Sequence, residues 1–149
     1  MPKRSTSDGA RLRFAMAALI RRLRREDGPI GIGPTGLALL GLLLQSGPAT
    51  ASELAAAENL QPQSLTRALR GLEQERLIGR RPDEDDRRRA ILWITPKGED
   101  LLRQTMRKRV AWLNAAIEAT LSDTERETLR AAADLLERLA AADECADRG

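Results

Sequence analysis

The sequence predicts a mainly α-helical fold with one small β-hairpin, an α+β combination. Strong helix formers (Ala, Leu, Arg and Glu) dominate the chain, and apolar residues recur at spacings of three and four over most of its length. One short run, AILWIT at residues 90–95, is instead rich in strand formers. A length of 149 residues suits one domain, or one small domain extended by dimerising helices.

Residues 8–27 are predicted to form the first helix, because Leu12, Met16, Leu19 and Leu23 fall on one face. Glycine and proline at residues 28–34 then interrupt the pattern. A second helix is expected from Pro34 to about residue 45. It contains the longest apolar run, LALLGLLL, which has the length of a buried core helix.

The next helix is expected to be short, and a tight turn joins it to a fourth helix. Thr50 and Glu53 form a capping box at the start of the first of them. Asn59 tolerates the left-handed conformation that a turn needs, and Pro62 suits the first position of the following helix. The apolar face of that helix is formed by Leu65, Ala68, Leu69 and Leu72.

Strands near residues 77–81 and at 90–95 are expected to pair as a hairpin, with residues 83–86 in its loop. Thr95 and Pro96 then provide an N-cap and a first helical residue. A long helix follows, and Ser122 and Glu125 form a second capping box before the last helix. The tail after residue 142 is expected to fray.

This order predicts a helix-turn-helix followed by a β-wing over residues 34–96. The second helix of such a motif must present polar or forked side chains that reach base edges in the major groove. Its solvent face holds Gln63, Thr66, Arg67 and Arg70, with Ser64 beside them. Gln can read adenine, Arg can read guanine, and the hydroxyls suit phosphates. An ordinary polar surface helix remains the alternative.

The hairpin is expected to contact DNA through Arg80, Arg81, Arg87, Arg88 and Arg89. A guanidinium at its tip can enter the minor groove, where the potential is negative. Asp86 and Arg88 lie two residues apart, on the same side of a strand-like segment, so the carboxylate could hold the guanidinium by a forked pair of hydrogen bonds. A solvated turn with compensating charges is the alternative.

The charge is unevenly distributed, although the net charge is only +3. It is +5 over residues 1–30, −2 over 31–60, +3 over 61–98 and −3 over 99–149. A localised basic zone suits a polyanionic partner, and bases that only solvate helix faces are the alternative. Without His, and with Cys145 as its single cysteine, the chain offers no usual zinc site, catalytic set or cofactor. No apolar run spans a bilayer and no signal sequence is visible, so we expect a cytoplasmic protein.

Residues 53–98, ELAAAENLQPQSLTRALRGLEQERLIGRRPDEDDRRRAILWITPKG, closely resemble the core of the MarR family of bacterial transcriptional regulators. The family's motifs occur here in order. They are Glu53-Leu54-Ala55, Thr66-Arg67, Leu72-Glu73, Arg80 or Arg81, Asp86-x-Arg88 and Thr95-x-x-Gly98. Two positions depart from the pattern: Glu58 replaces a usual apolar residue, and Gln61 replaces the usual Ser at the cap of the recognition helix.

The resemblance implies a homodimer of one MarR-like domain, residues 1–149. Residues 8–30 and 97–142 would be dimerisation helices and residues 34–96 the DNA-binding lobe. Two recognition helices would enter successive major grooves of a pseudo-palindromic operator, and Arg88, held by Asp86, would enter the minor groove. The expected dimer interface contains Leu12, Leu19, Val110, Leu113, Ile117, Leu129 and Leu136, with an intramolecular core as the alternative for some of them.

The sequence therefore predicts a sequence-specific regulator of double-stranded DNA. The resemblance further implies a repressor released by a small anionic or phenolic ligand. A helical protein–protein adaptor that has lost DNA binding is the alternative. Salt separates the two, because phosphate contacts release counterions and their affinity falls steeply as salt rises.

Overall fold

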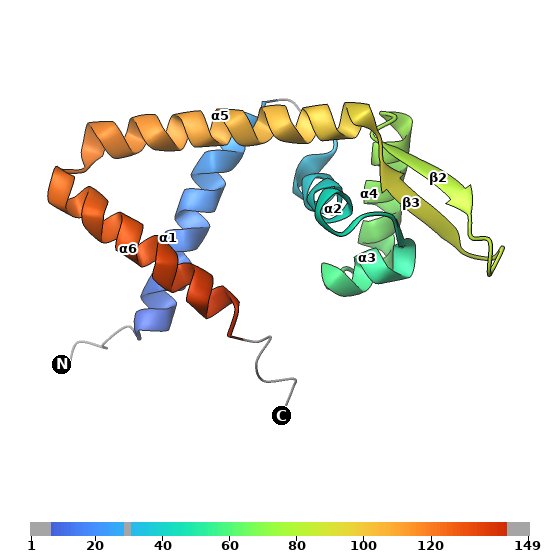
Figure 1. Ribbon diagram of the computed structural model, residues 1–149, viewed down its shortest axis with the longest axis horizontal. Helices are drawn as coiled ribbons and strands as arrows, with labels where there is room; N and C mark the ends of the chain where they lie inside the picture. The colour runs from blue at the N-terminus through green and yellow to red at the C-terminus, as the bar shows by residue number, and fades with distance from the viewer. Residues whose placement is uncertain (1–6, 29–30, 143–149) are drawn as a thin grey trace. The chain divides into compact units, whose positions relative to one another are not determined.

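The computed structural model describes residues 7–28 and 31–142 (Figure 1). Helix α1 (Asp8–Leu23) is followed by a 3-10 turn, η1 (Arg24–Asp27), and by α2 (Gly33–Ser46). The central part contains β1 (Ala49–Thr50), α3 (Ala51–Ala57), α4 (Pro62–Gln74), β2 (Ile78–Pro82) and β3 (Ala90–Ile94). The long helix α5 (Pro96–Thr120) and the helix α6 (Asp123–Ala140) complete the order. The mainly helical fold with a small sheet is confirmed.

The chain divides into two compact units, residues 1–109 and residues 110–149. The first contains the winged helix-turn-helix. The second contains the end of α5 and all of α6, and none of its described residues is buried. No helix within residues 7–28 and 31–142 is long and apolar enough to cross a membrane.

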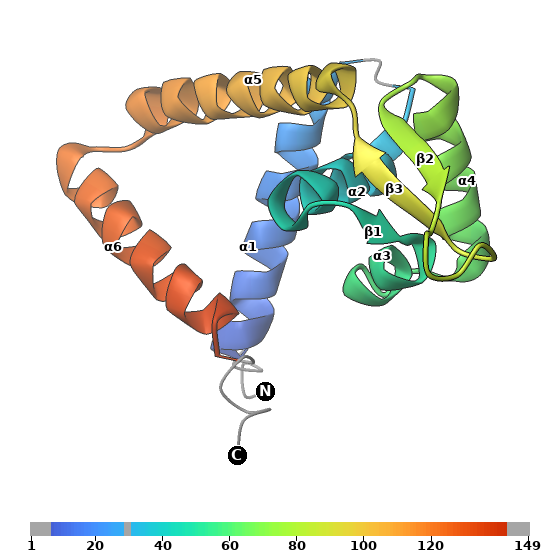
Figure 2. The ribbon, with the colours of Figure 1, turned by 45° about the vertical axis from the view of Figure 1, so that its right-hand side comes forward.

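A small antiparallel sheet in the first unit has the strand order β1-β3-β2 (Figure 2). The predicted hairpin is confirmed, with Ile78 opposite Ile94 and Pro82 opposite Ala90. The sequence did not predict β1, because two residues show no alternation. Thr50 has two roles: it pairs with Ile91 across the sheet, and it is the N-cap of α3.

The core of the first unit is built from leucines on α2, α3, α4 and β3. The largest fully buried side chains are Leu39, Leu40, Leu43, Leu54, Leu72 and Leu92. Each such side chain contributes about 1.5–3 kcal/mol by leaving water. The prediction that the apolar run of α2 is a core helix is confirmed, and α4 is held in place by the apolar face that it turns toward this core.

Both predicted capping boxes are present. The Thr50 backbone N–H donates to the Glu53 carboxylate over 2.7 Å, and the Ser122 N–H donates to Glu125 over 2.9 Å. These backbone hydrogen bonds favour the ionised form and are the main reason why the pKa of both carboxyls is lowered. The hydrogen bonds from the Thr50 and Ser122 hydroxyls make the second largest contribution. The caps thus fix where α3 and α6 begin.

Candidate nucleic-acid interface

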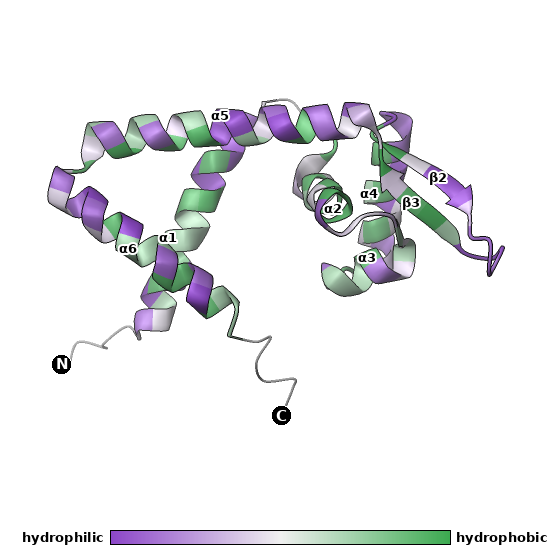
Figure 3. Ribbon diagram, in the orientation of Figure 1, coloured by the Kyte–Doolittle hydropathy of each residue, from purple (hydrophilic) through white to green (hydrophobic). Residues whose placement is uncertain are grey.

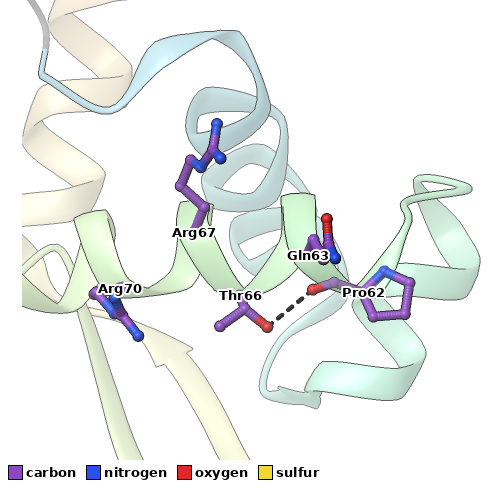
Figure 4. A pocket seen from close by; sticks show the side chains of 5 residues that line it. All are labelled: Pro62, Gln63, Thr66, Arg67 and Arg70. Carbon is purple, nitrogen blue, oxygen red and sulfur yellow. Dashed lines mark hydrogen bonds between the residues drawn. The ribbon is translucent and has the colours of Figure 1, made fainter.

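The solvent face of α4 carries the residues predicted to contact bases and phosphates. Leu65, Leu69 and Leu72 are buried beneath it. The exposed set is Gln63, Ser64, Thr66, Arg67 and Arg70. Figure 4 shows four of them, with Pro62, around a shallow hollow along one side of the helix. The guanidinium groups of Arg67 and Arg70 point apart, so the helix presents positive charge toward two directions.

The turn between α3 and α4 has the geometry that the sequence predicted. Asn59 adopts the left-handed conformation with φ 49°, and the Leu60 N–H donates to the Ala55 carbonyl over 2.9 Å. Glu58 follows the last residue of α3 and is exposed, so its charge costs the core nothing. Leu60 packs against the core two residues later.

The start of α4 is less well capped than the starts of α1, α3 and α6, each of which has a side-chain capping hydrogen bond. Gln61 occupies the N-cap position and its side chain makes no capping hydrogen bond, as its replacement of Ser predicted. The Thr66 hydroxyl donates to the Pro62 carbonyl over 2.8 Å. Its proton is therefore used within the helix, and a phosphate contact in which Thr66 donates requires this bond to break.

The wing loop is shaped by its own acidic residues. The Asp83 N–H donates to the Arg89 carbonyl over 3.0 Å, and the Arg89 N–H donates to the Asp86 carbonyl over 2.9 Å. The Asp83 carboxylate also accepts from the Asp85 N–H over 3.1 Å. Pro82 has no N–H to donate and lies in β2, an edge strand. Figure 3 shows that this loop is hydrophilic while β3 is largely hydrophobic.

The forked hydrogen bonds expected between Asp86 and Arg88 do not form, and these residues lie in a turn rather than in a strand-like segment. One Asp86 carboxylate oxygen accepts from the backbone N–H of Arg88 over 3.0 Å. The Arg88 Nε lies 4.0 Å from that oxygen, and the Arg88 side chain is 96% exposed. The reason is local, since an Asp side chain readily bonds the backbone two residues on. Asp86 therefore stabilises the turn that carries Arg88 and forms no hydrogen bond with its guanidinium.

Two arginines at the root of the wing lie beside carboxylates of the helix-turn-helix. The Arg80 Nε is 3.6 Å from a Glu73 oxygen. The charge of Arg89 adds to the lowering of the pKa of Glu53, after the hydrogen bonds from Thr50. The sequence reasoning placed both arginines with the DNA contacts and missed these partners. The Leu72-Glu73 and Glu53-Leu54-Ala55 motifs contained the carboxylates, but spacing along the chain did not show what lay opposite them.

The start of α5 is fastened to the turn between α4 and β2. The Thr95 N–H donates to the Leu77 carbonyl over 3.0 Å, and the Thr95 hydroxyl donates to the Arg76 carbonyl over 2.8 Å. The Lys97 ammonium donates to the Glu75 carbonyl over 2.7 Å. The end of the recognition helix and the first turn of α5 are thus joined by three hydrogen bonds.

A second tie on α5 was also missed from the sequence. Arg109 and Asp27 form a bidentate ion pair, with both N···O distances at 2.7 Å. The side chains are 24% and 12% exposed. The hydrogen bonds to Asp27 raise the pKa of Arg109. The two residues are 82 positions apart, so no local pattern indicated their pairing.

The expected dimer-interface residues are largely exposed in the single chain. Neither α1 nor α6 contains a buried residue. The exposed members of the set are Leu12, Leu19, Val110, Leu129 and Leu136, while Leu113 and Ile117 are partly buried. An intramolecular core does not form around the exposed members. Cys145 lies outside the described residues.

The MarR family model matches residues 32–90. An HTH-type transcriptional regulator from Mycobacterium tuberculosis is 33% identical over 125 residues, which cover 84% of this chain and 87% of that protein. The chain belongs to the MarR family. The resemblance inferred from residues 53–98 is thereby confirmed, and this MarR-family protein is a DNA-binding transcriptional regulator.

Solved structures confirm the winged helix-turn-helix fold. A transcriptional regulator protein from Pseudomonas aeruginosa is 38% identical, with a TM-score of 0.78 over 89% of this chain and 93% of that one. A MarR family protein from Bacillus stearothermophilus is 25% identical, with a TM-score of 0.75 over 95% and 99% of the two chains. MarR from E. coli is 21% identical and shares the fold, with a TM-score of 0.77 over 89% and 95%.

Proposed function

We propose that this regulator binds a pseudo-palindromic operator as a homodimer and represses transcription. Helix α4 of each subunit enters a major groove, and the wing tip enters the adjacent minor groove. The observation that carries this proposal is the pairing of two exposed surfaces on one buried core. The α4 face carries Gln63, Arg67 and Arg70, and the wing tip carries Arg88 with its side chain almost fully exposed.

The contacts divide into three kinds. Gln63 and Arg67 have side chains that read base edges, and Arg70 can bond either a base edge or a phosphate; Ser64 has a hydroxyl for phosphates, as does Thr66 once its bond to the Pro62 carbonyl breaks. Arg87 and Arg88 at the wing tip suit the minor groove. The remaining arginines of the wing, Arg80, Arg81 and Arg89, lie on or beside its strands, where the DNA backbone is the nearer target.

The homodimer is supported by the exposed apolar side chains of the terminal helices. Large apolar residues without cover in a single chain mark an association surface. They include Leu12 and Leu19 on α1, Val110 on α5, and Leu129 and Leu136 on α6. A twofold dimer would cover these side chains and set the spacing of the two recognition helices to about one turn of DNA.

Release by a small anionic or phenolic ligand rests on family membership. Such a ligand would act by favouring a spacing of recognition helices that misses the grooves. The experiment for the whole proposal is to select bound duplexes from a random pool, and then to titrate the selected duplex against rising salt. We expect an inverted-repeat site, a dimer in solution, and a steep loss of affinity with salt. A monomer, or a protein that ignores every duplex in dilute buffer, would refute it.

A further inference from the structure

A second hollow lies where α4 meets the root of the wing. Its floor includes the buried leucines Leu65 and Leu69, and its polar lining includes Arg70 and Glu73 of α4 and Arg80 of β2. Figure 4 shows Arg70 directed away from Arg67, which borders a separate hollow beside the start of α2. Two guanidinium groups and one carboxylate therefore share the α4–wing hollow, which leaves it a net positive charge.

Arg80 forms an ion pair with Glu73. The Nε to Oε1 distance is 3.6 Å, and the side chains are 54% and 34% exposed. Contact through Nε leaves the other four N–H donors of the guanidinium for another acceptor. Arg70 forms no ion pair within the part of the chain that the structure describes. Both arginines thus retain donors at the edge of the hollow.

We propose that the α4–wing hollow receives a backbone phosphate of the operator, with Arg70 and Arg80 as its donors and Glu73 as the residue that positions Arg80. This inference rests on the proposed function. When α4 lies in a major groove and the wing tip lies in the next minor groove, one phosphodiester strand separates the two. That strand must cross the protein between α4 and the wing, where the hollow lies.

The chemistry of the hollow fits a phosphate better than a base edge. A phosphate accepts charge-assisted hydrogen bonds from two guanidiniums at once. The apolar floor offers no group to read a base. Glu73 repels a phosphate in isolation, so its presence costs affinity unless it aims Arg80. Its role should therefore appear in the sensitivity of binding to one particular phosphate, and not in the overall affinity for DNA.

The test uses the full-length protein and the operator duplex that the wild type selects. Single phosphates of one half-site are replaced, one at a time, by neutral methylphosphonates. We expect one substitution, between the major-groove and minor-groove contacts, to weaken wild-type binding about tenfold. Arg80→Ala should lose this sensitivity while remaining sensitive to methylphosphonates elsewhere. It should also lower the salt slope of the dimer by about 1.8, because one phosphate contact is lost in each half-site.

Glu73→Gln separates positioning from charge. Removing a negative charge beside DNA raises general affinity, but the unaimed Arg80 should lose at least half of the response to the single methylphosphonate. Arg103 and Glu99 on α5 provide a matched control pair, with a separation of 3.7 Å and exposures of 58% and 39%. Arg103→Ala and Glu99→Gln should keep the methylphosphonate profile of the wild type. Thermal unfolding of each variant checks that the fold persists.

The outcomes distinguish this inference from the function on which it rests. If the wild type binds its operator specifically, but Arg80→Ala keeps full sensitivity at every position, the phosphate site is refuted and the regulator stands. If Glu73→Gln keeps the wild-type profile, the positioning role of Glu73 is refuted. If the wild type binds no duplex, the proposed function fails first.

Discussion

Replacing Gly98 by Ala should destabilise the protein through a clash that no side-chain movement relieves. Gly98 is the third residue of α5, and a Cβ there would lie 2.2 Å from the Leu77 carbonyl oxygen and 2.8 Å from Cγ1 of Ile94. Carbon and oxygen ordinarily approach to about 3.3 Å, so the first turn of α5 and the Leu77 carbonyl would have to separate by about 1 Å. That carbonyl is fixed, because it accepts the Thr95 N–H over 3.0 Å.

The cost follows from three contributions. Overpacking costs about 1–3 kcal/mol, and the strained Thr95 hydrogen bond costs up to about 1 kcal/mol. The better helix propensity of Ala returns about 0.5–1 kcal/mol. The net loss in the free energy of unfolding is therefore about 2 kcal/mol, which for a chain of this size lowers Tm by about 4–8 °C.

The assay is thermal and urea unfolding followed by circular dichroism at one protein concentration, since the proposed dimerisation would make Tm depend on concentration. Gly41→Ala is the matched control: Gly41 lies inside α2, and nothing lies within 4 Å of a Cβ built there. This control should be as stable as the wild type or more stable. The reasoning fails if Gly98→Ala unfolds at or above the wild-type temperature, or if the two variants behave alike.

The other predictions concern DNA binding and stability. Arg88→Ala should weaken binding to the operator by about tenfold or more while the dimer persists in size-exclusion chromatography; unchanged mobility-shift titrations would contradict the wing assignment. Gln63→Ala should change the selected sequence more than non-specific affinity, and identical sites for both proteins would count against α4 as the reader of bases. Asp27→Ala leaves Arg109 without its carboxylate and should cost about 1–2 kcal/mol in urea unfolding, less than a fully buried pair, whereas equal midpoints would show that the pair contributes nothing. Because the pKa of Glu53 is lowered, its capping contribution is present above its ordinary value of 4.5 and lost as pH falls below it; Glu53→Gln should therefore flatten the acid limb of the stability curve, and an unchanged limb would refute this.

Most of the fold was predictable because its determinants are local. Capping boxes, the proline that begins α4 and the left-handed Asn59 depend on residues within four positions of one another, and all appear as predicted. The strand β1 was not predictable, since its two residues are defined only by their partners on β3. The same holds for the Arg109–Asp27 pair, which requires the fold to bring distant residues together.

For the candidate site, it was easier to predict which side chains face solvent than to predict which groups they bond. The exposed face of α4 followed from helical periodicity, since the buried leucines fix which side faces solvent. The role of Asp86 did not follow, because two donors of Arg88, its backbone N–H and its guanidinium, compete for the Asp86 carboxylate, and spacing along the chain does not rank them. In the structure the Arg88 backbone N–H donates to an Asp86 carboxylate oxygen over 3.0 Å, while the Arg88 Nε lies 4.0 Å from the same oxygen.

The ties on α5 constrain how any signal could reach the recognition helix. The hydrogen bonds of Thr95 and Lys97 join the first turn of α5 to the three residues that follow α4. About 18 Å further along α5, Arg109 is held by Asp27, the last residue of η1. A ligand that disturbed the second tie and left the first intact would move α4 together with the start of α5, without changing the shape of α4. Such a ligand would alter the spacing at which two α4 helices are presented, while the bases that each one reads stay the same.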